Sequence, residues 1–228
     1  MRPNRHALIV AGGSGTRMGS ETPKQFLPLK GLPILMHTIS AFNSISVKPI
    51  ITLVLPAHQV EVWELLCKQY SFKIPHCIVS GGDTRFQSVK NGLMSIDSEG
   101  LVAIHDGVRP LASYDLIERC YRVAESQGNA IPAIKPVESV RIGNAHQSRN
   151  ENRDLMWLVQ TPQVFNLAEI KECYSVKWSD VFTDDATVAE AYGINVNIVE
   201  GERENIKITT PMDLAIAETI LGLRLERG

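Results

Sequence analysis

Near its N-terminus the chain carries the apolar run His6-Ala7-Leu8-Ile9-Val10-Ala11, which passes directly into Gly12-Gly13-Ser14-Gly15-Thr16-Arg17-Met18-Gly19. Glycines that directly follow a first strand let the backbone approach a phosphate and point several N–H groups at it. The stretch is not a Walker loop, which would end in Gly-Lys-Ser/Thr. It is not a dinucleotide fingerprint either, because Met18 stands where glycine or alanine is needed. We therefore expect an α/β fold with a phosphate-binding loop of another kind.

Short β-branched runs alternate with helix-length amphipathic segments along the first 134 residues. The expected strands are His6–Ala11, Ile50–Leu55, Cys77–Val79, Leu101–His105 and Ala130–Ile134. The expected helices are Ile34–Phe42, Gln59–Tyr70, Arg85–Ile96 and Tyr114–Gln127. This alternation predicts βαβ units and a mostly parallel sheet covered on both faces, which is a three-layer α/β/α sandwich of Rossmann-like type.

The second half of the chain is less regular. From position 136 to about 160 polar residues dominate a segment that is too long for an ordinary connection. Further helices are expected at Leu167–Val176 and Asp184–Tyr192, a strand at Ile194–Glu200, and a last helix opened by Thr210 and Pro211. We find no internal repeat and no low-complexity linker, so we expect one domain over residues 1–228.

The net charge, the hydropathy pattern and the cysteine spacing each exclude some classes of protein. The net charge is −2 and no segment reaches the roughly 18 apolar residues of a membrane span, so we expect no nucleic-acid or membrane partner and a cytoplasmic protein. The cysteines show neither C-x-x-C pairing nor a histidine at zinc-ligand spacing, and we expect buried or idle thiols at Cys67, Cys77, Cys120 and Cys173.

Two cations stand close to the glycine-rich loop. Arg17 lies within it and Lys24 follows seven residues later. An arginine fork and a lysine point charge both suit a triphosphate that loses pyrophosphate, because negative charge builds on the leaving bridge oxygen and on the α-phosphoryl oxygens. The alternative is a tight turn with two solvated surface charges.

The motif A-G-G-S-G-T-R-M-G…P-K-Q-F-L resembles the signature of sugar-phosphate nucleotidyltransferases, and its P-K-Q form resembles the 2-C-methyl-D-erythritol 4-phosphate cytidylyltransferase family. The resemblance continues in the same order through further segments, which are Gly81–Val89, His105–Pro110, Gln160–Gln163, Thr183–Ala186, Glu200–Gly201 and Asn205–Lys207. It covers nearly the whole chain, which makes it far more specific than any single motif.

The resemblance implies that CTP and 2-C-methyl-D-erythritol 4-phosphate are converted to 4-diphosphocytidyl-2-C-methyl-D-erythritol and pyrophosphate, in the non-mevalonate isoprenoid pathway. An acceptor phosphate oxygen attacks the α-phosphorus in line, without a covalent intermediate. Mg²⁺ is the implied cofactor, and other divalent cations are compatible. Two alternatives stay open: a ribitol 5-phosphate cytidylyltransferase, which shares the P-K-Q motif, and a non-catalytic nucleotide-binding relative.

Roles for individual residues follow from the resemblance. It implies catalytic roles for Arg17, Lys24, Arg153 and Lys207. Substrate contacts are implied for Ala11, Gly12, Gly13, Gly82, Asp83, Ser88 and Gly107, with the backbone at Gly82 and Asp83 and the Ser88 side chain reading the cytosine and ribose. Asp106 follows a strand, where metal-binding carboxylates gather in α/β sheets, and is the implied metal ligand; the alternative is a turn cap. Arg109 is implied to hold the acceptor phosphate. We expect His105 to be a core histidine. The alternative for the Gly81–Thr84 stretch is that Asp83 or Thr84 only caps the next helix, and the two roles are compatible.

The polar segment 136–160 resembles the projecting β-arm through which these enzymes form homodimers. In that interpretation Ser139 and Arg153 reach the neighbouring subunit's site, and Thr161, Thr183 and Lys207 come from the same chain. The sequence departs from the usual pattern here, because Glu138-Ser139 replaces Asp-Thr and Asn152 precedes Arg153 where aspartate is frequent. Serine keeps the hydroxyl, so the contact survives in principle. The alternative is a disordered surface loop.

Overall fold

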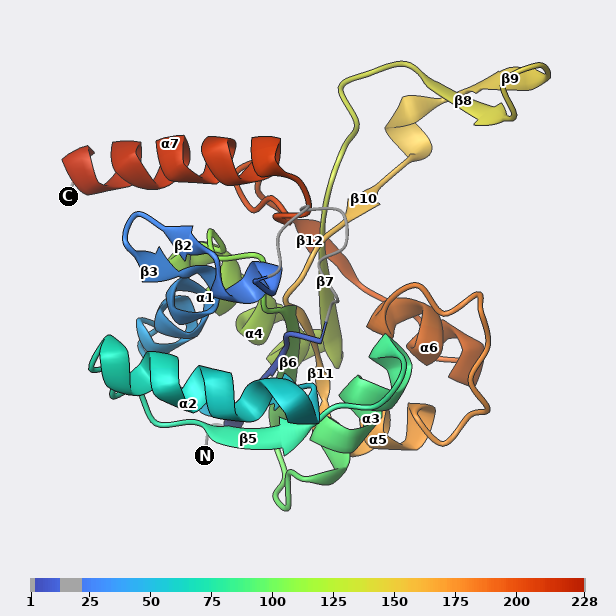
Figure 1. Ribbon diagram of the computed structural model, residues 1–228. Coiled ribbons are helices and arrows are strands. Elements are labelled where there is room, and N and C mark those ends of the chain that lie inside the picture. The colour runs from blue at the N-terminus through green and yellow to red at the C-terminus, as the bar shows by residue number, and fades with distance from the viewer. Residues whose placement is uncertain (1–2, 13–21, 228) are drawn as a thin grey trace.

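A twisted sheet runs through the middle of the molecule, with helices on both of its faces (Figure 1). This computed structural model describes residues 3–12 and 22–227, apart from the side chains of residues 225 and 227. In the described part the sheet has eight strands in the order β10-β7-β11-β6-β1-β4-β5, with β12 beside β7. Their bounds are β1 Arg5–Val10, β4 Ile50–Leu55, β5 Cys77–Ser80, β6 Leu101–Asp106, β7 Asn129–Ile134, β10 Leu158–Val159, β11 Gln163–Asn166 and β12 Ile198–Glu200.

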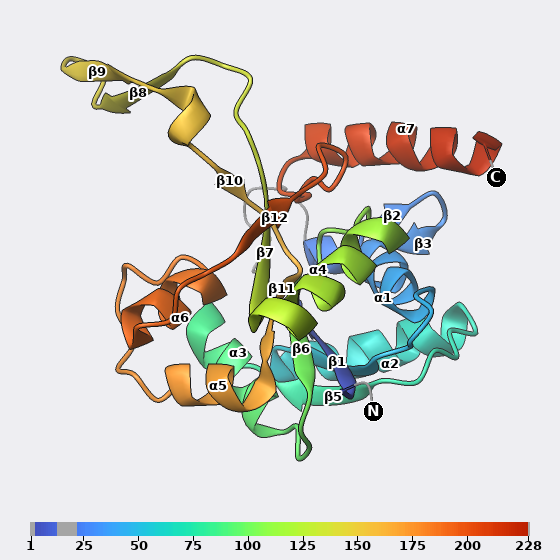
Figure 2. The ribbon, with the colours of Figure 1, turned by 180° about the vertical axis from the view of Figure 1, so that it is seen from behind.

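The two faces of the sheet are buried by different sets of helices. Along β1, Ala7 and Ile9 belong to one core cluster and Leu8 and Val10 to the other, as the two-residue period of a strand requires. The first cluster includes residues of α1 (Ile34–Asn43), α2 (Val60–Gln69) and α4 (Tyr114–Gln127); the second includes residues of α3 (Arg85–Met94), α5 (Leu167–Cys173) and α6 (Asp185–Tyr192). Figures 1 and 2 show these two groups on opposite sides of β6, β7 and β11. The three-layer α/β/α prediction is confirmed.

The sheet is more mixed than the sequence pattern indicates. Strands β5, β4, β1 and β6 are parallel, as predicted. Strand β11, which was not predicted, lies between β6 and β7 and is antiparallel to both. The strand expected at Ile194–Glu200 is shorter, since its paired part begins at Ile198. All four cysteines are free thiols, as expected.

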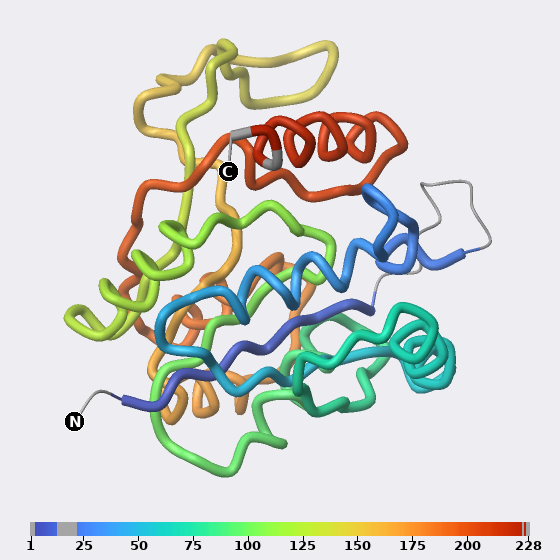
Figure 3. The backbone as a smooth tube through the Cα atoms, turned by 90° about the vertical axis from the view of Figure 1, so that its left-hand side faces the viewer, coloured from blue at the N-terminus to red at the C-terminus, as the bar shows by residue number. Residues whose placement is uncertain are grey.

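The polar segment forms a hairpin that projects from the body of the molecule (Figures 1 and 3). Its strands are β8 (Val140–Gly143) and β9 (Ser148–Glu151), and a short 3-10 helix, η4 (Arg153–Leu155), follows them. Almost every side chain of the arm is exposed, including Leu155 at 74% and Trp157 at 44%. The predicted β-arm is therefore an ordered element of this chain's fold and not an irregular loop.

The last helix, α7 (Pro211–Arg227), lies at the same end of the body as the arm (Figure 3). It packs against the small hairpin β2 (Pro28–Leu29) and β3 (Leu32–Pro33). Its start has the predicted cap, because Thr210 Oγ1 accepts from Asp213 N and the Asp213 carboxylate accepts from Thr210 N. Within the described residues no helix has the length and apolar character that a membrane crossing requires.

Candidate active site

A cavity of about 220 Å³ lies where β1, β5 and β6 end. Val10 pairs with Asp106 in the register of β1 and β6, so the residues after β1 and the end of β6 meet at one edge of the sheet. Eight of the predicted site residues line this cavity: Ala11, Gly12, Lys24, Gly82, Asp83, Ser88, Asp106 and Lys207. We call it the first cavity.

The start of α3 forms one wall of the first cavity. Thr84 is the helix N-cap, and its Oγ1 accepts from Gln87 N, which settles the choice between Asp83 and Thr84. Ser88 Oγ accepts from Gly82 N at 3.1 Å. A Cβ at Gly81 would lie 2.8 Å from that same Ser88 oxygen, so a larger residue here would displace the Ser88 hydroxyl.

Asp106 is surrounded by three cations. Its Oδ2 lies 3.0 Å from Lys207 Nζ and 3.3 Å from Arg109 Nε, and its Oδ1 lies 3.8 Å from Arg85 Nε. Burial alone would raise the pKa of the Asp106 carboxyl, but Lys207, Arg85 and Arg109 hold this pKa well below its usual range. Asp106 is therefore an anion at neutral pH.

A chain of hydrogen bonds lies behind Asp106. Asp106 N donates to Thr161 Oγ1 at 3.1 Å, and Thr161 Oγ1 lies 3.0 Å from His105 Nδ1. The other ring nitrogen, Nε2, is 3.0 Å from the carbonyl oxygen of Arg109 and must carry the proton, so Nδ1 accepts from the threonine hydroxyl. His105 is fully buried and lines neither cavity, as expected of a core histidine.

A second cavity, also of about 220 Å³, adjoins the first. Arg85, Asp106 and Lys207 line both of them. Three more predicted site residues, Arg109, Thr161 and Thr183, line the second cavity. The carboxylate of Asp106 and two cations thus stand between two separate spaces, each lined by polar side chains.

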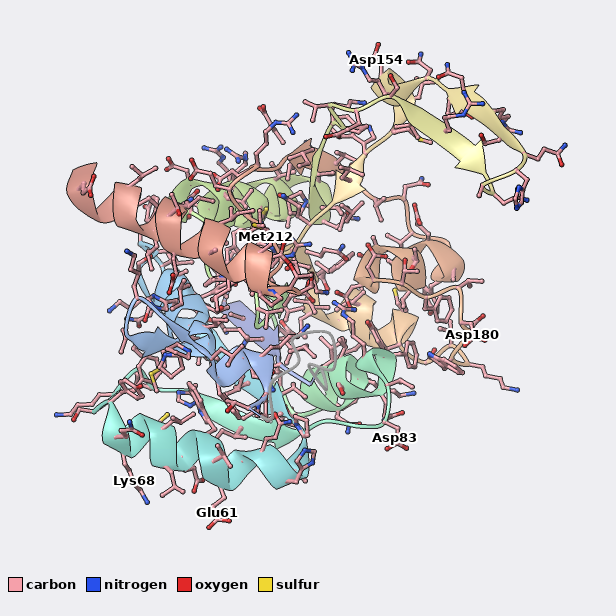
Figure 4. All side chains as sticks on the ribbon, turned by 45° about the horizontal axis from the view of Figure 1, so that its top comes forward. Glu61, Lys68, Asp83, Asp154, Asp180 and Met212 are labelled. Carbon is pink, nitrogen blue, oxygen red and sulfur yellow. The ribbon has the colours of Figure 1, made fainter. Side chains whose placement is uncertain are left out.

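Not every predicted site residue is brought to these cavities. Gly107 lines neither one; its N–H donates to Val10 O and its carbonyl accepts from Thr38 Oγ1. Ser139 and Arg153 are exposed on the arm, where Arg153 Nη1 donates to Val137 O. Figure 4 shows Asp154, the neighbour of Arg153, far from Asp83 at the first cavity. Gly13 and Arg17 lie outside the described residues.

Arg85 is a site residue that the sequence reasoning missed. It is the first residue of α3, directly after Gly-Gly-Asp-Thr, and lines both cavities. In this motif the resemblance implies roles for Gly82, Asp83 and Ser88 alone. The sequence does contain a signal for Arg85, because a cation at the start of a helix that closely follows a strand is well placed to bind a phosphate.

The site is compatible with one divalent cation. No group of three or more His, Cys, Asp or Glu side chains that could hold a metal occurs among the described residues. Mg²⁺, however, is often held by one or two carboxylates together with phosphate oxygens of the substrate. Asp106 fits that pattern, because it is ionised and its Oδ1 has no partner within hydrogen-bond distance among the described residues.

This fold and site define a phosphate-handling α/β transferase of the nucleotidyltransferase class, with lysine, arginine and aspartate side chains gathered at the strand ends between two adjoining cavities. The family model for 2-C-methyl-D-erythritol 4-phosphate cytidylyltransferase matches residues 5–223. The chain belongs to that family.

Similar proteins agree with this assignment. The 2-C-methyl-D-erythritol 4-phosphate cytidylyltransferase of Phocaeicola vulgatus is 51% identical over 218 residues, covering 96% of this chain and all of the relative. The corresponding protein of Bacteroides fragilis is 51% identical over 217 residues, which are 95% and 99% of the two chains.

Solved structures are similar over the same length. The Francisella tularensis 2-C-methyl-D-erythritol 4-phosphate cytidylyltransferase has a TM-score of 0.76 at 32% identity, and the match covers 95% of this chain and 99% of that one. The 4-diphosphocytidyl-2C-methyl-D-erythritol synthase of Anaerococcus prevotii has a TM-score of 0.80 at 29% identity, with 96% and 99% covered.

Proposed function

We propose that this chain transfers the cytidylyl group of CTP to 2-C-methyl-D-erythritol 4-phosphate and releases pyrophosphate. The observation that carries the proposal is the pair of cavities that share Arg85, Asp106 and Lys207. A nucleotide in the first cavity and an acceptor phosphate in the second would meet at these three side chains. The relatives that cover nearly the whole chain carry the name of this activity.

The reaction forms one bond and breaks one. An oxygen of the acceptor phosphate attacks the α-phosphorus of CTP, and the bond from that phosphorus to the bridging oxygen breaks, so that pyrophosphate leaves with its electron pair. A phosphate is already anionic near neutral pH, and no general base is needed. The work of the protein is positioning and charge neutralisation.

We assign these tasks to side chains of the two cavities. Lys24, together with Arg17, stabilises the five-coordinate α-phosphoryl centre and the leaving pyrophosphate. Lys207 and Arg109 orient the acceptor phosphate, with Thr161 and Thr183 beside it in the second cavity. The wall at Gly82, Asp83 and Ser88 takes the cytosine and the ribose.

Asp106 would hold the divalent cation, through the carboxylate oxygen that faces Arg85. Such a cation, when bound, neutralises triphosphate oxygens as charge develops on the leaving group. The protein's part is to keep this carboxylate ionised and fixed, which Lys207 and Arg109 do by binding its other oxygen.

A second copy of the chain would complete each site. Arg153 and Ser139 lie on the arm, away from both cavities of their own chain. The arm also exposes large apolar side chains, which are Val137, Ile142, Leu155, Trp157, Leu158 and Val159. Several exposed apolar side chains on one projecting element are suited to a protein contact. We assign the arm to a homodimer in which Arg153 and Ser139 hold the partner's acceptor phosphate.

A pyrophosphate-release assay tests the proposed function. CTP and Mg²⁺ are supplied with 2-C-methyl-D-erythritol 4-phosphate in one reaction and with ribitol 5-phosphate in another. We expect release with the first acceptor and little with the second. Faster turnover with ribitol 5-phosphate would establish the alternative acceptor, and absence of release with both would establish a non-catalytic relative.

A further inference from the structure

Asp185, at the start of α6, is a fully buried carboxylate that the reaction scheme leaves without a task. Its two oxygens accept from the guanidinium of Arg85, from Nη1 at 2.9 Å and from Nη2 at 2.6 Å. Tyr174 donates its hydroxyl to Oδ1 at 2.6 Å. Burial and the neighbouring Asp185 carboxylate raise the pKa of Tyr174 well above its ordinary value, so this hydroxyl keeps its proton. A buried carboxylate is costly unless it is paired in this way.

The same guanidinium faces a second carboxylate. Both of its terminal nitrogens are bound to Asp185, and its remaining nitrogen, Nε, points to Asp106 Oδ1 across 3.8 Å. That separation is too long for a hydrogen bond, so Arg85 supplies positive charge beside Oδ1 without occupying it. Asp106 Oδ2, in contrast, is bound by Lys207 and Arg109.

The pairing with Asp185 determines where the guanidinium of Arg85 lies relative to Asp106. An arginine fork binds a carboxylate most strongly when two N–H groups reach its two oxygens. If Asp185 did not hold the fork of Arg85, the nearest remaining carboxylate would be Asp106, and a direct pair would cover Oδ1. Arg85 is about 30% exposed at the side chain, so the cavities leave it room to move.

We infer that Asp185 is a positioning residue that holds Arg85 away from Asp106 Oδ1 and so keeps that oxygen open to the divalent cation that accompanies CTP. The inference rests on the proposed function, because it assumes that Asp106 holds this cation. In this arrangement Asp185 fixes the position of Arg85, and the positive charge of Arg85 helps to keep Asp106 ionised. The Tyr174 hydroxyl stabilises the Asp185 carboxylate by donating to it.

The test is Mg²⁺-dependent CTP binding followed by calorimetry, without acceptor. Asp185→Asn should raise the Mg²⁺ concentration for half-maximal CTP binding about tenfold, within the range typical of residues that orient a metal ligand. CTP binding in excess EDTA should change little. The double variant Asp185→Asn with Arg85→Gln removes the competing guanidinium, and it should bring the Mg²⁺ requirement back toward the wild-type value.

Glu118→Gln is the matched control. Arg5 and Glu118 form another Arg–carboxylate pair, at 2.8 Å, which lines neither cavity. This variant should lower the melting temperature and leave the Mg²⁺ requirement unchanged. If Asp185→Asn behaves in the same way, or if the double variant needs as much Mg²⁺ as the single one, Asp185 serves folding alone and the inference fails.

Tyr174→Phe covers the case in which Asp185→Asn does not fold. This substitution removes the hydroxyl that donates to Asp185 Oδ1 and keeps the aromatic ring, which stacks on Phe86 with ring centroids 4.7 Å apart. We expect a smaller rise in the Mg²⁺ requirement, and no rise would overturn the inference. If wild-type protein binds CTP with no Mg²⁺ dependence, the metal role within the proposed function fails first and the inference falls with it.

Discussion

Lys24 lines the first cavity and its neighbours are held in place by hydrogen bonds and packing. It begins the 3-10 helix η2 (Lys24–Phe26). The next residue, Gln25, donates to Ala11 O at 2.9 Å and to Gln59 Oε1 at 2.6 Å, and Phe26 is buried against Trp63. A charge held by locked neighbours can act as a preorganised donor to a transition state.

Lys24→Ala should therefore lower turnover by a factor of roughly 10² to 10³, the usual cost of losing one such donor. Its melting temperature should stay close to that of the wild type, because the side chain is not part of the core. Lys68, which is exposed on α2 and points away from the body in Figure 4, provides the control substitution Lys68→Ala. Near-normal turnover of Lys24→Ala would remove Lys24 from the mechanism.

His105 links the site to the pH dependence of stability. Burial lowers the pKa of His105 to about 4, because the charged imidazolium would lose its hydration in the core. The unfolded chain takes up this proton near pH 6.5 and the folded chain only near pH 4. The free energy of unfolding therefore falls as the pH drops through that window, by about 2 kcal/mol at pH 5.

Urea unfolding at pH 7 and pH 5 measures this loss. His6 and His37 also have pKa values lowered by burial, so the wild type loses the sum of three contributions. His105→Gln keeps a donor for the Arg109 carbonyl and should lose about 2 kcal/mol less than the wild type over the same interval. Equal losses in the two proteins would assign the pH dependence to other groups.

The elements that could be predicted from sequence are the long ones with an unambiguous period. Helix α4 was expected at the bounds observed, because Leu116, Ile117, Cys120, Tyr121 and Ala124 form one apolar stripe, and all of them are buried. Strand β11 was missed because Gln163–Asn166 has four residues and a polar residue at each end. Its position is fixed by pairing with β6 and β7, which no local pattern reveals.

The same limit applies to the candidate site. Gly12, Gly82 and Asp106 stand at or just after strand ends, and Lys24 follows the glycine-rich loop, so local sequence is enough to single them out. Arg85 and Asp185 are 100 residues apart, and only the packing of α3 against α5 and α6 brings them together. Gln163 shows the same dependence, since it bonds both Asp184 Oδ2 and Ala186 N at the start of α6. A missed strand thus supports the second cavity.

At the scale of the whole molecule, the position of the arm bears on whether Arg153 acts in the site of its own chain or in that of a partner chain. Arg153 is exposed and bonded to Val137 O within its own arm, and it lines neither cavity. A lone charge on a projecting hairpin holds a phosphate well when something rigid supports it. A two-fold dimer gives that support, because an isologous interface carries each arm onto the other subunit in the same way.

Mixed dimers test this arrangement. Arg153→Ala and Lys24→Ala should each be nearly inactive alone, since each lesion is then present in both sites. A heterodimer of the two places both lesions in one site and neither in the other, if Arg153 acts on the partner subunit. Random assortment of equal amounts gives about half heterodimers, so co-refolding should restore roughly a quarter of wild-type activity. Capture of untagged Lys24→Ala by affinity-tagged Arg153→Ala measures the subunit exchange. If exchange is complete and the Arg153→Ala mixture stays inactive, Arg153 acts within its own subunit or has no part in the reaction.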